Sequence, residues 1–301
     1  MARNTSVGGQ AVIEGVMMRG LAGIATAVRT EQGEIVVEKK EYRSYTKKNK
    51  LVGLPIIRGF IALIESLVIG VKTLNYSASF FEEEGEPSKL DKCIEKLFKE
   101  KSNDVVMGVS LIISLALSIG LFFIVPTLVA NLFSKLGTGT MGMNIVEGII
   151  RVLIFLSYVY LIGKMEDIKR VYEYHGAEHK TIFCYENEVE LTPENAAKFG
   201  RLHPRCGTNF LFLVMIVSII VFSLTGWNSI GERIMYRIIL LPFISGISYE
   251  IIKWMGKSKS NLAKILSYPG LKLQNLTTRE PDLSQLEVAI RALKVAEGIA
   301  D

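Results

Sequence analysis

Histidine and cysteine are both scarce in this chain, which has three of each among 301 residues. The cysteines, Cys93, Cys184 and Cys206, are odd in number and far apart, so they exclude a disulfide framework and fit a reducing compartment. The first residues contain no apolar segment before a cleavage site, and we expect no signal peptide. The sequence also has no basic–aromatic patch, which argues against a nucleic-acid partner despite the net charge of +5.

Charge is missing from long stretches of the sequence. Residues 105–133 contain no charged side chain and exceed the roughly 20 residues that a helix needs to cross a bilayer. Three further segments are apolar enough to be predicted as spans, although one of them is slightly short: 145–163, 210–225 and 234–252. The sequence therefore predicts an integral membrane protein whose first partner is the lipid bilayer.

Lysine and arginine are concentrated on one side of these four spans. The loop 164–208 contains seven of them, whereas the loops 134–143 and 226–233 contain one each. The positive-inside rule then places loop 164–208 and both termini in the cytoplasm of a multi-pass protein of the cell membrane. A fifth span at 56–74 would place the N-terminus on the outer side of the membrane, against the positive-inside rule. We therefore expect this charged, partly apolar segment to be an amphipathic or interfacial helix.

The predicted fold is mainly α, a polytopic bundle of about four membrane helices with one amphipathic helix and a small N-terminal β-element. Glycines around short apolar runs, and a hairpin centred on Gly33, predict the strands. In the tail, Pro269-Gly270 predicts a turn and Asp282 a helix N-cap. We expect four parts: a cytoplasmic β-rich segment (1–55), a helix and charged linker (56–104), a four-span domain (105–252) and a cytoplasmic tail (253–301).

The scarce histidines gather in one short region between the second and third spans. His175 and His179 lie four residues apart, so on a helix they share one face and can hold one metal ion. Glu178 lies beside them and could handle a proton, and the His-x-x-Glu-His spelling is that of the inverted zincins. The downstream carboxylate ligand of that soluble peptidase class cannot be located in the sequence.

A third metal ligand is expected from the segment that leads into the third span. His203 and Cys206 are the two candidates, and a short helix starting at Thr192-Pro193 would return the chain to the membrane near them. Supporting roles are open to four charged residues: Glu14, Arg19, Asp167 and Arg205. The alternative is that the histidines and Cys206 simply pack or hydrogen-bond within the structure.

Three classes of function follow from these residues. The first is a zinc-dependent hydrolase at the inner membrane surface, with Glu178 as the catalytic base and a membrane-proximal peptide or a lipid as substrate. The second is a scaffold or assembly factor that recruits a protein partner and uses the histidines structurally. Transport ranks last, because the charges within the spans lie toward span ends and no repeat of broken helices is evident.

Four ordered motifs together resemble those of the YqhQ-like family of bacterial multi-pass membrane proteins. The motifs span nearly the whole chain and occupy 8–20, 174–180, 203–208 and 277–281. The resemblance implies a multi-pass membrane protein for which a metal-dependent activity is predicted, and it implies no particular reaction.

Overall fold

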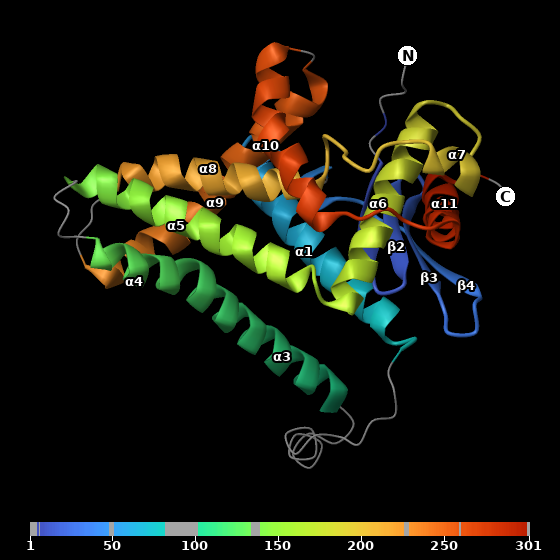
Figure 1. Cartoon of the computed structure of the whole chain (residues 1–301), viewed down its shortest axis with the longest axis horizontal. Coiled ribbons are helices and arrows are strands. Elements are labelled where there is room, and N and C mark those ends of the chain that lie inside the picture. The colour runs from blue at the N-terminus through green and yellow to red at the C-terminus, as the bar shows by residue number, and fades with distance from the viewer. Residues whose placement is uncertain are drawn as a thin grey trace. The chain divides into compact units, whose positions relative to one another are not determined.

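The computed structural model describes residues 5, 7–47, 51–81, 102–133, 139–225, 229–258 and 260–299 (Figure 1). Four strands come first: β1 (Gly8–Val12), β2 (Gly15–Gly20), β3 (Gly23–Arg29) and β4 (Ile35–Lys40). The helices are α1 (Ile57–Ala78), α3 (Ser102–Ile119), α4 (Val125–Leu132), α5 (Gly139–Ile162), α6 (Glu166–Glu186), α7 (Pro193–Ala197), α8 (Gly207–Ser223), α9 (Ile230–Lys257), α10 (Asn261–Thr277) and α11 (Leu283–Glu297). The predicted charged linker falls largely at 82–101, outside the described residues.

The strands form an antiparallel sheet in the order β1-β2-β3-β4, as the glycine-rich start of the chain predicts. Glu14 lies in the turn between β1 and β2 with a φ of 47°, and Gly33 lies in the β3–β4 hairpin with a φ of 88°. Opposed residues of β2 and β3, such as Val16 with Ala27, are completely buried. The sheet therefore has a core face that another layer must cover.

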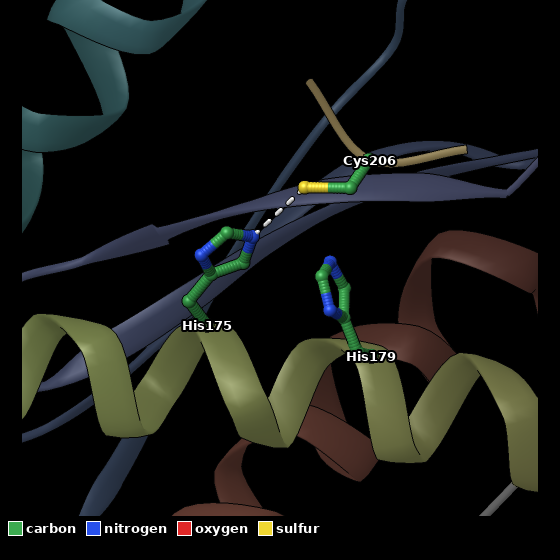
Figure 2. A group of neighbouring side chains, drawn as sticks. All are labelled: His175, His179 and Cys206. Carbon is green, nitrogen blue, oxygen red and sulfur yellow. Dashed lines mark hydrogen bonds between the residues drawn. The ribbon is translucent and has the colours of Figure 1, made fainter. Parts of the chain in front are cut away.

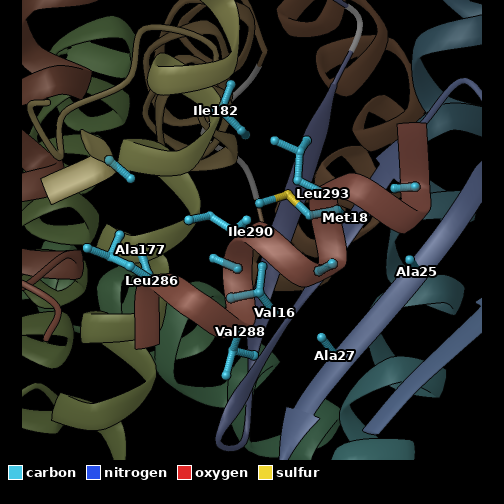
Figure 3. Packing of buried hydrophobic residues seen from close by; sticks show 14 of the residues in the cluster. Val16, Met18, Ala25, Ala27, Ala177, Ile182, Leu286, Val288, Ile290 and Leu293 are labelled. Carbon is cyan, nitrogen blue, oxygen red and sulfur yellow. The ribbon is translucent and has the colours of Figure 1, made fainter. Parts of the chain in front are cut away.

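The last helix provides much of that layer. Leu286, Ile290 and Leu293 of α11 are buried in one apolar cluster with Val16 and Met18 of β2 (Figure 3). Tyr174, Ala177 and Ile182 of α6 belong to the same cluster. The N-terminal sheet, the helix α6 and the last helix thus share one hydrophobic core, although they are far apart in sequence.

Helix α1 is amphipathic, as predicted for the segment 56–74. Its buried positions are small or polar: Gly59, Glu65, Gly70, Thr73 and Ser77. The Glu65 carboxylate accepts hydrogen bonds from the Tyr42 hydroxyl at 2.6 Å and the Tyr45 amide at 2.6 Å. Large apolar side chains such as Leu67 and Val68 are exposed on the other side of the helix.

Within the described residues, three helical segments are long and apolar enough to cross a membrane: Gly108–Leu132, Gly139–Ile162 and Gly231–Lys257. The first of them consists of α3, a π-helical turn and α4, in which Pro126 occupies the first turn. Helix α8, with 17 residues, is a shorter apolar helix. The prediction of a mainly helical membrane protein with a small N-terminal sheet is confirmed.

The chain divides into two compact units. One contains residues 1–81, 159–218 and 239–301, and the other contains 82–158 and 219–238. In the second unit, Glu147 is almost fully buried and accepts a hydrogen bond from Arg151 at 2.7 Å and one from Arg237. Three charged side chains within the predicted spans therefore pair with one another.

Two local expectations were wrong. Helix periodicity predicts one continuous helix from the second span to the histidines, but α5 ends at Ile162 and the extended Met165 separates it from α6. Pro269-Gly270 forms no turn and lies inside α10. At position 270 a Cβ atom would come within 2.1 Å of the Asn209 side chain, so close packing on α8 favours glycine within this helix.

Candidate metal centre

Helix α6 presents the histidine motif on one face. Glu166 and Asp167 stand in its first turn, where acidic side chains favour the positive end of the helix dipole. His175, Glu178 and His179 follow about two to four turns later, and all three line one cavity of about 420 Å³. The helical prediction for this motif is confirmed, and its spacing brings the three side chains to the same space.

His175 is held by both of its ring nitrogens. Its Nδ1 lies 2.8 Å from the carbonyl oxygen of Thr277, and its Nε2 lies 3.2 Å from the sulfur of Cys206 (Figure 2). Because a carbonyl can only accept a hydrogen bond, Nδ1 carries the proton and donates it to Thr277. The lone pair of Nε2 then points toward the Cys206 sulfur.

His179 repeats this arrangement one helical turn later. Its Nδ1 donates to the carbonyl oxygen of Arg201 at 2.6 Å, and its Nε2 is buried without a hydrogen-bond partner. Burial lowers the pKa of His179, so the ring is neutral at pH 7 and Nε2 is an acceptor. An orphaned buried acceptor is costly, and a bound metal ion would satisfy it.

Cys206 completes a group of three metal-competent side chains. The ligand atoms of His175, His179 and Cys206 all lie within 4.8 Å of one another. The Thr208 amide donates toward the Cys206 sulfur at 3.4 Å, and the Thr208 hydroxyl lies 3.1 Å from it. Metal-binding histidines commonly donate a hydrogen bond from their second ring nitrogen to a carbonyl, and the Nδ1 atoms of His175 and His179 both make such a bond. The site could therefore hold a metal ion.

Glu178 is buried in the same cavity. Its carboxylate accepts a hydrogen bond from the Gly9 amide of β1, and a Cβ atom at position 9 would lie only 3.0 Å from its oxygen. Burial raises the pKa of Glu178, while the nearby His175 and His203 rings and the Gly9 amide act in the opposite direction. The N-terminal strand thus fixes the carboxylate beside the histidines.

His203 lies next to the group without belonging to it. Its ring centre is 5.5 Å from that of His179, and burial lowers its pKa to about 4, so the ring is neutral at pH 7. Gln274 of α10 holds its backbone, accepting from the His203 amide at 2.7 Å and donating to the His203 carbonyl at 2.8 Å. Of the two candidates for the third ligand, the geometry favours Cys206.

The other predicted residues have separate places. Arg205 lines the cavity, pairs with Glu186 and donates to the Thr5 carbonyl at 2.6 Å. Glu14 pairs with Arg170 on α6, outside the cavity lining. Arg19 lies 5.6 Å above the Tyr42 ring, and Asp167 is an exposed residue of the first turn of α6. Arg205 therefore lines the site, whereas these other three lie away from the cavity lining.

Sequence reasoning overlooked the residues that hold the candidate site in place. Gln274 and the Thr277 carbonyl come from α10, and the buried Glu186 comes from the end of α6. The motif 277–281 was the available signal, because it joins the histidine motif in the family resemblance. In the structure its Arg279 amide donates to the Tyr172 carbonyl on α6 at 2.8 Å.

Comparison with known proteins agrees with the motifs. Residues 54–298 match the family described as "Protein of unknown function (DUF1385)". The chain is 37% identical to "Uncharacterized protein YqhQ" of Bacillus subtilis (strain 168) over 290 residues, which cover 95% of this chain and 90% of that relative. No solved structure matches this chain. The match over residues 54–298 and the identity over nearly the full length show that the chain belongs to the DUF1385 family.

Proposed function

We propose that this protein is a metal-dependent hydrolase that acts at the cytoplasmic surface of the cell membrane. The ion would be held by His175, His179 and Cys206. The observation that carries the proposal is the pair of rings with Nδ1 bound to carbonyls, one of which leaves a buried, unpartnered Nε2 beside a buried cysteine. Two imidazoles and one thiolate form a donor set typical of Zn²⁺ and leave a position for substrate.

Glu178 is the group proposed to move protons. When bound, the ion would supply Lewis-acid chemistry and make water a better nucleophile near neutral pH. Glu178 lines the same cavity, and its burial favours proton uptake. It would accept a proton from the attacking water and return it to the leaving group. His203 and Arg205 would shape the cavity and hold the segment that carries Cys206.

The cytoplasmic location is supported by the positive charge of loop 164–208 and by the shared core of the sheet, α6 and α11. Elements that pack in one core must lie on the same side of a membrane. The substrate would then be a peptide or a lipid headgroup close to the inner leaflet.

Elemental analysis of the detergent-purified protein tests the metal. We expect about one ion per chain in the wild type, and loss of most of it in His179→Ala and Cys206→Ala, which each remove a ligand. Cys184→Ala is the matched control, because Cys184 is also buried but lies against the Val189 and Glu190 carbonyls. Equal metal content in all four proteins, or none in the wild type, would exclude the proposed site.

Glu178→Gln tests the catalytic step in the same preparation. It should retain the metal and lose roughly 10²–10⁴-fold in hydrolysis, since it removes only a general base. The assay would screen membrane-derived peptides and phospholipids as substrates. Full metal with undiminished hydrolysis in Glu178→Gln would contradict the role of Glu178. A bound metal without hydrolysis of any substrate would favour the scaffold hypothesis.

A further inference from the structure

Helix α10 has two faces of different character. Its inner face packs against two apolar helices, α8 and α9. Ala263 is buried in one apolar cluster with Leu213 of α8 and Met255 of α9. Gly270 lies directly against Asn209, in the first turn of α8. The helix is therefore held beside the start of α8 and the end of α9 (Figure 1).

The outer face of α10 is apolar and basic. The large side chains Leu262, Ile265 and Tyr268 are 57%, 67% and 58% exposed, which is unusual for three residues of one helix in water. Lys264 and Lys272 are also exposed, and the segment 261–277 contains no aspartate or glutamate. Exposed apolar residues with lysines and no acids are characteristic of helices that lie in an anionic membrane surface.

The short connection to α9 limits how far α10 can lie from the end of that candidate span. Only Ser258–Ser260 separate Lys257, the last residue of a candidate span, from Asn261. Since each residue extends the chain by at most about 3.5 Å, α10 begins within about 14 Å of the end of that span. A helix that starts so near the bilayer, with its apolar side uncovered, meets lipid before it meets any other partner.

We propose that α10 is an interfacial membrane helix, with its outer face inserted among anionic lipids of the leaflet where α9 ends. This inference rests on the membrane placement of α8 and α9 and is independent of the hydrolase proposal. Its inner face supplies Gln274 and the Thr277 carbonyl, which hold His203 and His175. The candidate metal centre is therefore anchored at the level of the lipid headgroups, where a ligand with a lipid-bound headgroup can reach it.

Quenching of tryptophan fluorescence by brominated lipids tests this placement in the full chain. Ile265→Trp and Glu31→Trp would be reconstituted in vesicles of phosphatidylcholine and phosphatidylglycerol with bromine near the headgroup end of the acyl chains. The wild type, which contains Trp227 and Trp254, gives the background. Glu31→Trp is the matched control, because it also replaces an exposed side chain, in this case one of the β3–β4 hairpin.

We expect the fluorescence added by Ile265→Trp to be largely lost in brominated vesicles and that added by Glu31→Trp to be retained. At equal mole fraction, brominated phosphatidylglycerol should quench Ile265→Trp more than brominated phosphatidylcholine does. This preference should disappear when Lys264 and Lys272 are replaced by glutamine. Equal quenching at positions 265 and 31 would overturn the proposal, and equal quenching by the two lipids would overturn its anionic component. Neither readout depends on bound metal or on hydrolysis.

Discussion

At the scale of single residues, tertiary packing explains why the histidine motif has a glycine at position 176. A Cβ atom at this position would lie 2.0 Å from the Arg279 carbonyl oxygen, so the loop after α10 crosses α6 in direct backbone contact. The sequence identifies Gly176 only as a spacer between His175 and Glu178. Glycine is favoured at this position because the segment around Arg279, about 100 residues further along the chain, contacts α6 there. No local sequence pattern could reveal that contact.

Gly176→Ala should therefore destabilise the protein and weaken metal binding. Overpacking of this kind costs about 1–3 kcal/mol, and it would displace the loop next to the Thr277 carbonyl that orients His175. Thermal unfolding and metal content would be measured together. Gly200→Ala is the control, since a Cβ atom there meets nothing within 4 Å. Equal melting temperatures of the two variants would show that the contact is unimportant.

At the scale of elements, local signals predicted helix starts well and tertiary contacts decided the rest. Thr192 caps α7 by accepting from the Asn195 amide, and Asp282 begins α11 within a capping box, both as predicted. Pro269 was misread because proline usually ends a helix, whereas packing of Gly270 on α8 supports α10 through this position. The candidate ligand pair on α6 follows from periodicity, but the preference for Cys206 over His203 as the third candidate depends on the fold.

The capping box of α11 makes a pH-dependent contribution to stability. Although burial acts to raise it, hydrogen bonds from the Ser284 hydroxyl and the Gln285 amide hold the pKa of Asp282 below its ordinary value. Because the folded pKa is lower than the unfolded value of about 3.9, this stabilisation is complete above that pH and is lost as the pH falls through the folded pKa.

Asp282→Asn isolates this effect, since asparagine also caps helices but does not titrate in this range. The wild type should exceed the variant by about 0.5 kcal/mol at pH 7, the usual value of a carboxylate at a helix N-terminus. The difference in unfolding free energy should shrink toward zero near pH 3. A difference that stays constant from pH 7 to pH 3 would show that the carboxylate charge contributes nothing.

At the scale of the whole molecule, the shared core limits how the chain can cross a membrane. The sheet, α6 and α11 pack together, so the chain must cross an even number of times before α6 and again after it. In the proposed topology, the candidate spans Gly108–Leu132 and α5 would make the first two crossings, and the shorter α8 with the candidate span of α9 would make the other two. The charge distribution predicts the same arrangement, and the contacts of α1 with β1 argue against a fifth crossing by α1.

Cysteine labelling in intact cells tests this topology. Met141→Cys and Ser229→Cys should react with a membrane-impermeant maleimide from outside, because Met141 is near the start of α5 and Ser229 directly precedes α9, in or beside the two loops that contain only one basic residue each. Glu31→Cys should react only after the cells are permeabilised. The wild type accounts for reaction of its three cysteines. Labelling of Glu31→Cys alone in intact cells would show that the orientation is the opposite of the one proposed. Labelling of all three variants from outside would contradict four crossings.

The union of the first strands with the last helix also sets an order of events during synthesis. The sheet leaves the ribosome first, but the part of its core face that α11 covers stays open until residues 283–297 have been made. The apolar helices of the described residues are translated in that interval, and the Thr277 carbonyl that orients the candidate ligand His175 is made only after them. A chain that stops before α11 could enter the membrane, yet it would lack the core that joins its ends.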